Sequence, residues 1–274
     1  MIFIVNNLFK HLAFLVLVLF ISSCSFSDWR ANSYKSDIPE VQKSEILDVN
    51  RFEKSGETKL DDELVIPDKI NLSMIFYSQS PYGDWGLPYQ ESCEEASLLL
   101  AYYYLTDKKP DINEFHKDLL AMIEWEKQNF GQYFHTSVEE TAEMADQYLG
   151  LHNYEIIDNP TIDQIKKALA QGFPIVAPFS GRDLGNPFFS GTGPFYHMLV
   201  IKGYDEENFI SNDVGTRQGA NFKYKYESIF NAMHDLVPEV FTDKSAIVNG
   251  AKRILILKPN DEPSPGDLDL ELIE

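Results

Sequence analysis

Three side chains in this sequence are of the types that carry out acyl transfer through a thiol. Cys93 stands at the start of the stretch SCEEASLLLAYYYL, and His197 opens the apolar run HMLVIKGY. Asp213 ends the next such run, NFISND. A thiolate attacks carbonyl carbons, an imidazole transfers protons, and a carboxylate holds the imidazole in one tautomer. The three residues are therefore candidates for nucleophile, general base and orienting acid.

The elements around these residues are expected to bring them together. Helical spacing after Cys93 places the thiol at a helix N-terminus, where unpaired N–H groups favour a thiolate. If HMLVIKGY and NFISND form a hairpin that turns near residue 206, Asp213 faces Leu199 and lies one diagonal from His197. The Gly-rich and aromatic loop before His197, GRDLGNPFFSGTGPFYH, is either a wall of a cleft or an ordinary surface connection.

Two glutamines precede the cysteine and offer amide donors. Gln79 lies in FYSQSP and Gln90 lies in LPYQES. Either amide N–H could stabilise the negative charge that develops on a carbonyl oxygen under attack. The two residues after the cysteine, Glu94 and Glu95, oppose thiolate formation, so a cationic partner would be important here.

The first 23 residues predict export. Lys10 and His11 precede the apolar run LAFLVLVLFI, and small residues follow in ISSC. This order is typical of a signal peptide (1–23), with an uncleaved membrane anchor as the alternative. The sequence ISSC also resembles the bacterial lipobox, which implies lipidation of Cys24. Both interpretations place the domain outside the cytoplasm, tethered to a membrane.

This location bears on the second cysteine. The sequence contains two cysteines, Cys24 and Cys93. Exported proteins generally pair their cysteines in disulfides, but a lipidated Cys24 would leave Cys93 without a partner. A free thiol outside the cytoplasm is exposed to oxidation, so we expect Cys93 either to be buried in the core or to take part in catalysis.

Composition and motifs argue against several other classes of protein. The formal net charge is -20 and the pI is near 4.6, which argues against a nucleic-acid partner. The other histidines are scattered without metal-binding spacing, and no Gly-rich loop follows a strand to hold phosphate. We therefore expect no metal and no cofactor. These patterns indicate neither the oligomeric state nor a particular substrate.

Residues 24–67 are charged and poor in aromatic residues, which predicts a flexible linker, and the acidic residues 259–274 predict a disordered tail. The compact domain is expected over 68–258. In it, a strand over KINLSMIFYSQ and helices from Ser92 or Cys93, near 111–125, near 137–149 and over 161–171 precede five apolar strand-like runs. Helices followed by an antiparallel sheet predict an α+β fold.

The stretches FYSQSPYGDWGLPYQESCEEAS and YHMLVIKGYDEENFISNDVGTRQG resemble the C39-like group of papain-like cysteine peptidases. The resemblance implies a papain-like fold, with the nucleophile helix packed on an antiparallel sheet. It also implies Cys93 as nucleophile, His197 as base and then acid, Asp213 as orienter and Gln79 as oxyanion donor. Two features depart from the family pattern: Glu94-Glu95 replaces the usual glycine, and Gln79 lies fourteen residues before the cysteine. Gln90 therefore stays the alternative donor.

The function expected from these features is peptide-bond hydrolysis by a membrane-tethered cysteine peptidase, with a peptide or protein as substrate. A thiol acyltransferase or a cell-wall peptide amidase would use the same nucleophile. An inactive papain-like domain that only binds a partner is the third interpretation, favoured by the Glu94-Glu95 pair.

Overall fold

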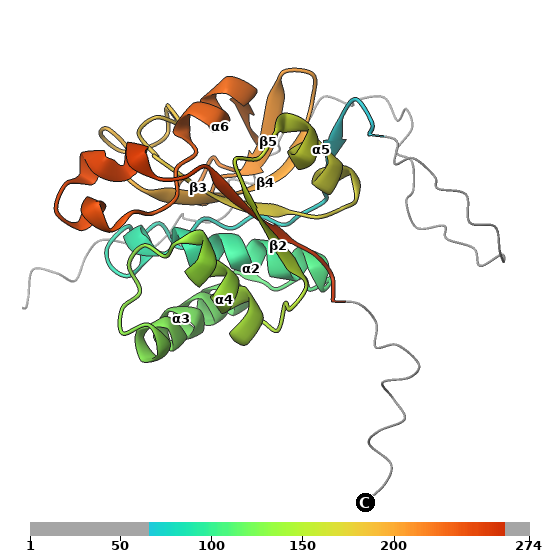
Figure 1. Ribbon diagram of the computed structural model, residues 1–274. Coiled ribbons are helices and arrows are strands. Elements are labelled where there is room, and N and C mark those ends of the chain that lie inside the picture. The colour runs from blue at the N-terminus through green and yellow to red at the C-terminus, as the bar shows by residue number, and fades with distance from the viewer. Residues whose placement is uncertain (1–65, 261–274) are drawn as a thin grey trace, which may run out of the picture. The chain divides into compact units, whose positions relative to one another are not determined.

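The structure is a computed structural model that describes residues 66–260 (Figure 1). The expected signal peptide (1–23), Cys24, almost all of the expected linker (24–67) and almost all of the acidic tail (259–274) lie outside the described residues. None of the helices in residues 66–260 has the length and hydrophobicity needed to cross a membrane.

The described residues form a mixed helix-and-sheet domain. The α-helices are α2 (Cys93–Leu105), α3 (Ile112–Asn129), α4 (Val138–Gln147), α5 (Ile162–Ala170) and α6 (Tyr226–Ala232), with short 3-10 helices at Tyr89–Glu91, Pro238–Phe241 and Lys244–Asn249. The strands are β1 (Ile70–Asn71), β2 (Tyr154–Asp158), β3 (Ile175–Phe179), β4 (His197–Tyr204), β5 (Asn208–Asn212), β6 (Phe222–Lys225) and β7 (Arg253–Leu257).

All strand pairings are antiparallel, in the order β2-β7-β3-β4-β5-β6, with β1 paired to β4. Helices cover both faces of this sheet: α2, α3 and α4 lie on one side, and α5 and α6 on the other (Figure 1). Along β4, Met198 and Val200 pack into the hydrophobic core shared with α2, α3 and α4. Leu199 and Ile201 pack into the core on the other face, shared with α5 and α6. Successive strand side chains point to opposite faces, so this apolar run supplies both cores. The α+β prediction is confirmed.

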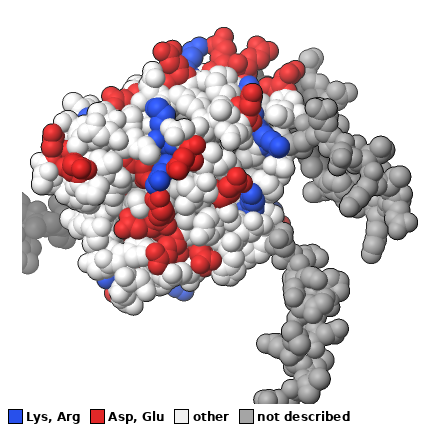
Figure 2. Space-filling view, viewed as in Figure 1, with Lys and Arg blue, Asp and Glu red and all other residues white. Residues whose placement is uncertain are grey.

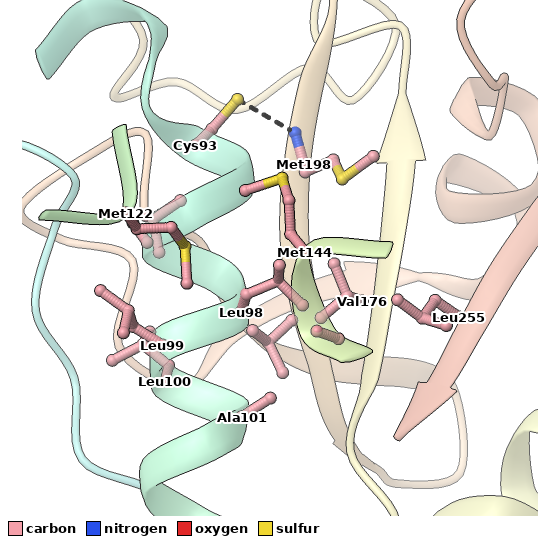
Figure 3. Packing of buried hydrophobic residues seen from close by; sticks show 14 of the residues in the cluster. Cys93, Leu98, Leu99, Leu100, Ala101, Met122, Met144, Val176, Met198 and Leu255 are labelled. Atoms are coloured by element: carbon pink, nitrogen blue, oxygen red, sulfur yellow. Dashed lines mark hydrogen bonds between the residues drawn. The ribbon is translucent and has the colours of Figure 1, made fainter. Parts of the chain in front are cut away.

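The helix α2 is buried on nearly all sides. Ten of its thirteen residues are buried, because α3 and α4 cover it on one side and β4 on the other (Figure 3). After its first turn the helix is almost entirely apolar or aromatic, as expected of a helix in such a central position. Its N-terminus therefore has a fixed place in the domain.

Local sequence explains where the surrounding helices begin. Asp111, Ser137 and Thr161 each accept a hydrogen bond from a backbone N–H of the first turn, and the residue three positions later closes a capping box. Gly172, with a φ of 86°, ends the turn after α5 in a left-handed conformation that glycine adopts without strain. The predicted helices near 111–125, 137–149 and 161–171 are confirmed.

The strand predicted over KINLSMIFYSQ is wrong in length, because only Ile70 and Asn71 pair, with Tyr204 and Gly203. The β1 residues pair with the part of β4 beyond Ile201, the last β4 residue that pairs with β3. After Asn71 the chain leaves the sheet, because β3 occupies that edge of β4. A Cβ on Gly203 would lie 2.3 Å from the carbonyl oxygen of Ile70, so the close approach of β1 requires glycine there. The sequence analysis did not predict β2 or α6.

The core around α2 makes a prediction about stability. Leu98 is fully buried, whereas Leu120 on α3 is 36% exposed. We expect Leu98→Ala to lower the free energy of unfolding by about 2–5 kcal/mol, because it leaves a cavity. Leu120→Ala is the matched control and should cost less than about 1 kcal/mol. Urea unfolding of both variants checks this, and equal losses would contradict the central position of α2.

Candidate active site

Two hydrogen bonds dock the first turn of α2 against the start of β4. The backbone N–H of Met198 donates to Sγ of Cys93 at 3.4 Å, as drawn in Figure 3. One turn further along, Oγ of Ser97 donates to the carbonyl oxygen of Met198 at 3.3 Å. Positions i and i+4 share one helix face, so both side chains reach the same strand residue. The thiol is thereby held beside the residue that follows His197.

The imidazole of His197 is bonded to a buried carboxylate. Nε2 of His197 lies 2.8 Å from Oδ1 of Asp213, and both side chains are almost fully buried. Near the site the hairpin has the expected register, with Val200 opposite Asn212. A bulge between Ile201 and Gly203 shifts the register by one residue toward the turn. The bond through Nε2 leaves Nδ1 as the ring nitrogen available for proton transfer.

Three further groups hold the carboxylate of Asp213. Oδ2 accepts from the hydroxyl of Tyr224 at 2.5 Å and from Nδ2 of Asn186 at 2.9 Å, and Oδ1 accepts from the N–H of Gly215 at 3.0 Å. Burial alone would raise the pKa of Asp213. The charge and hydrogen bond of His197, with the bonds from Tyr224 and Asn186, outweigh burial and lower that pKa. Asp213 is therefore ionised and oriented.

Two glycines in the loop after Asp213 leave room for this pair. A Cβ on Gly215 would lie 2.7 Å from Cε1 of His197, and one on Gly219 would lie 1.8 Å from the carbonyl oxygen of Asp213. Either substitution would move the backbone or the imidazole. The sequence DVGTRQG thus permits close packing around His197.

Gln79 and Gln90 differ in burial. Gln79 is buried, and its Nε2 donates to the carbonyl oxygen of Tyr89 at 2.8 Å, which closes the loop between the two residues. One N–H of this amide remains available, because the side chain carries two. Gln90 is exposed, and its Nε2 donates to Oε1 of Glu91 at 2.7 Å.

A cavity of about 600 Å³ brings four of the sequence-predicted residues together: Gln79, Gln90, Cys93 and His197 all line it. Asp213 lies behind His197, and Cys24 lies outside the described residues. The loop before His197 forms part of the cavity wall through Arg182 and through 188–190 and 193–196, which decides between the two interpretations of that loop.

The thiol is in contact with the neighbouring glutamate. Sγ of Cys93 donates to Oε2 of Glu94 at 3.0 Å. Burial, followed by the charge and hydrogen bond of Glu94, raises the pKa of Cys93 well above its ordinary value. Burial also raises the pKa of Glu94 to about 7. In residues 66–260 no hydrogen bond joins Sγ of Cys93 to His197, so the resting side chain is a thiol turned toward Glu94.

Two more buried carboxyls lie behind Glu94. Glu95 and Glu126 are almost fully buried, and both oxygens of Glu95 and Oε2 of Glu126 have no hydrogen-bond partner among the described residues. Burial, with repulsion from the charge of Glu126, raises the pKa of Glu95 well above its ordinary value, and burial raises that of Glu126 to about 7. In residues 66–260 no group of His, Cys, Asp and Glu side chains is arranged to hold a metal ion.

Sequence analysis missed Asn186, Tyr224 and Glu126. Glu126 had a detectable signal, because it continues the buried stripe of Phe115, Leu119, Met122 and Ile123 along α3. Asn186 lies in an irregular loop, where no period marks inward-facing positions. Tyr224 is the buried residue of β6. Its hydrogen bond to Asp213 depends on the path of the loop between β5 and β6, which the sequence does not reveal.

Residues 71–237, more than half of the 274 residues, match the model of the Peptidase_C39 like family. The chain belongs to this family. The family prediction made from the cysteine and histidine segments is thereby confirmed, and membership supports a cysteine peptidase fold. A search of curated proteins found no match.

Among solved structures, the C39-like chain is similar to a proposed C39-like peptidase from Bacillus anthracis. The identity is 15% and the TM-score 0.47, over 72% of this chain and 100% of the other. It is also similar to xylellain, a cysteine protease from Xylella fastidiosa. Here the identity is 16% and the TM-score 0.36, over 71% of this chain and 87% of the other.

The bond between Cys93 and Glu94 makes the thiol pKa testable. Glu94→Gln removes the negative charge at the sulfur, so we expect the pKa of Cys93 to fall toward its ordinary value. Mass spectrometry of the Cys93 peptide, after iodoacetamide treatment across a pH series, measures this. Glu124→Gln, at an exposed position of α3, is the control and should leave the profile unchanged. A profile unaltered by Glu94→Gln would show that Glu94 does not set the thiol pKa.

Glu126 predicts a pH-dependent stability. Its pKa of about 7 in the folded chain exceeds the ordinary value of 4.5, so the folded chain holds a proton that the unfolded chain releases. This contribution to stability is complete below the ordinary value and is lost as the pH rises through about 7. Glu126→Gln should therefore lose less stability than the wild type between pH 5 and pH 8. Urea unfolding at both pH values checks this, with Glu124→Gln as control; parallel losses would refute it.

Proposed function

We propose that this protein is a cysteine peptidase that hydrolyses peptide bonds through Cys93, His197, Asp213 and Gln79. One observation carries the proposal: the thiol, the imidazole and the Gln79 amide border a single cavity, and His197 is bonded through Nε2 to a buried carboxylate. Membership of the C39-like family supports the same chemistry.

In the first half of the proposed reaction, Nδ1 of His197 takes the thiol proton and Sγ of Cys93 attacks the carbonyl carbon of the substrate. The new S–C bond places a negative charge on the carbonyl oxygen. The amide of Gln79 and the backbone N–H of Cys93 would stabilise it, since the first N–H groups of a helix lack an acceptor within the helix. His197 then returns the proton to the leaving nitrogen as the peptide C–N bond breaks.

In the second half, water attacks the carbonyl carbon of the thioester and forms a C–O bond while Nδ1 of His197 accepts its proton, and the C–S bond then breaks. Collapse of the oxyanion releases the carboxylic acid, and the proton returns to Sγ of Cys93. Throughout, Asp213 keeps its charge and orients the ring. Its hydrogen bonds from Tyr224 and Asn186 suit that role, because they favour the ionised form.

Glu94 favours a second candidate function. Because the resting thiol donates to Glu94 and its pKa is raised, the cavity could serve only to bind peptides, with Cys93 as a buried side chain. The proposed peptidase requires the proton to pass from this arrangement to His197. The two candidates therefore differ in whether the thiol ever ionises near neutral pH.

We also propose that the domain works outside the cytoplasm, tethered through lipid on Cys24. The export signal in residues 1–23 and the lipobox-like ISSC support this location. A tethered peptidase would meet peptide and protein substrates near the membrane surface.

Alkylation of Cys93 across a pH series separates the two candidates. In the full chain carrying Cys24→Ser, the peptidase predicts a limb of iodoacetamide reactivity below pH 7, because an imidazolium stabilises the thiolate. His197→Ala should remove this limb and lower cleavage of a fluorogenic peptide library by about 100-fold or more. His152→Ala, at an exposed histidine outside the cavity, is the matched control. Equal alkylation profiles in the wild type and His197→Ala, with no peptide cleavage by either, would refute the peptidase and support the peptide-binding module.

A further inference from the structure

The cavity at the candidate site has the opposite charge to the rest of the protein. The chain carries 23 Lys and Arg against 43 Asp and Glu, and acidic side chains spread over the face shown in Figure 2. The cavity, in contrast, is lined by Arg182, Arg217 and Lys244, and among residues 66–260 Glu91 is the one Asp or Glu that lines it. A local reversal of charge in an acidic protein points to recognition of an anionic group.

The three cations come from three separate segments. Arg182 lies in the loop before His197, Arg217 in the loop between β5 and β6, and Lys244 opens a 3-10 helix. All three side chains are exposed, and none forms an ion pair with another described residue. Each therefore retains its capacity to bind an anion.

The one acidic side chain in the cavity is already engaged. Oε1 of Glu91 accepts from Nε2 of Gln90 at 2.7 Å, and its Oε2 lies 3.4 Å from Nε2 of His135. Burial lowers the pKa of His135, and Lys244 adds to this, while Glu91 opposes it. His135 therefore adds no fixed positive charge at neutral pH, and the positive potential comes from the arginines and the lysine.

Aromatic side chains complete the cavity wall. Trp85, Phe188, Phe189 and Phe195 border it, and Nζ of Lys244 lies 4.8 Å from the centre of the Phe195 ring. A ligand that fits this surface combines apolar groups with carboxylates. Inside a cavity that also holds a thiol and an imidazole, a peptide with acidic side chains meets both requirements.

The acidic surface elsewhere does not cancel this preference. The Debye length is about 8 Å at physiological ionic strength, so exposed charges farther away are largely screened. A peptide seated in the cavity responds mainly to the charges that border it, and among the described residues these are three cations against the single carboxylate of Glu91.

We propose that the cavity selects peptides carrying Asp or Glu side chains close to the scissile bond, through Arg182, Arg217 and Lys244. The proposal names the substrate class of the peptidase proposed above and rests on that function. Its test is therefore a binding measurement, which does not need catalysis.

The test uses the full chain with Cys93→Ala and two fluorescently labelled hexapeptide pools. The pools share neutral residues at four positions and differ only in having Glu or Gln at the two central ones. Fluorescence anisotropy at 0.15 M salt should show about tenfold tighter binding of the Glu pool, the sum expected when each of its two glutamates forms one exposed charge pair.

Replacement of the cations should remove this preference. Arg182→Gln, Arg217→Gln and Lys244→Gln, combined, should bring the two pools within about twofold of each other. The combined control Lys109→Gln, Lys127→Gln and Lys167→Gln changes the net charge equally at exposed positions outside the cavity, and should keep the preference. Far-UV circular dichroism checks that both variants fold.

Equal binding of the pools, no binding of either, or a preference that survives the cavity substitutions would overturn the proposal. So would loss of the preference in the control variant, which would assign it to net charge. Cleavage of the Glu pool by protein with intact Cys93 is scored separately. Binding preference without cleavage would refute the peptidase and leave a site for acidic peptides, whereas cleavage of both pools alike would refute only the specificity.

Discussion

The docking of α2 against β4 is the contact on which the candidate site depends. Met198 bonds both Cys93 and Ser97, so a single strand residue fixes the first turn of the helix. His197 precedes Met198, and its side chain is therefore placed by the same strand that holds the thiol. A shift of the helix by one residue would break both bonds and turn Cys93 away from the imidazole. The burial of α2 on nearly all sides makes that shift costly.

Features that depend on residues close together in the sequence, such as helix positions and the register of the hairpin, could be predicted. The helices near 111–125, 137–149 and 161–171 could be predicted because each is capped by residues only three positions apart, and a count along the hairpin placed Asp213 near His197. Pairing across the chain was harder to predict. The alternation after Lys69 indicated a long strand, but only two residues find a partner, because β3 already occupies most of that edge of β4. The donors to Asp213 from Asn186 and Tyr224 depend on loop paths that carry no periodic signal.

Groups that favour and groups that oppose negative charge lie close together at the candidate site. A helix N-terminus favours a thiolate, yet Glu94 accepts a hydrogen bond from the thiol, and burial together with the charge of Glu94 raises the thiol pKa. Farther in, burial raises the pKa of Glu95 well above its ordinary value and that of Glu126 to about 7, because it disfavours the charged carboxylates. At the mouth of the cavity the sign reverses, with arginine and lysine on separate segments. Buried carboxyls on α2 and α3 thus lie behind the thiol, whereas the cations lie on the segments that line the cavity.

The bond from Asn186 to Asp213 links two parts of the domain that evolution would otherwise change independently. Loops around a cleft usually diverge freely as proteins acquire new ligands. Here the loop before His197 both borders the cavity and supports the carboxylate behind the imidazole. The N–H of Phe188 bonds Oδ1 of Asn186 at 3.0 Å and the Phe189 ring packs against His197, so insertions in 190–195 can reshape the cavity without disturbing that support. Changes that move Asn186 itself would alter the histidine, so divergence of this loop within the family should be confined to one side of a fixed asparagine.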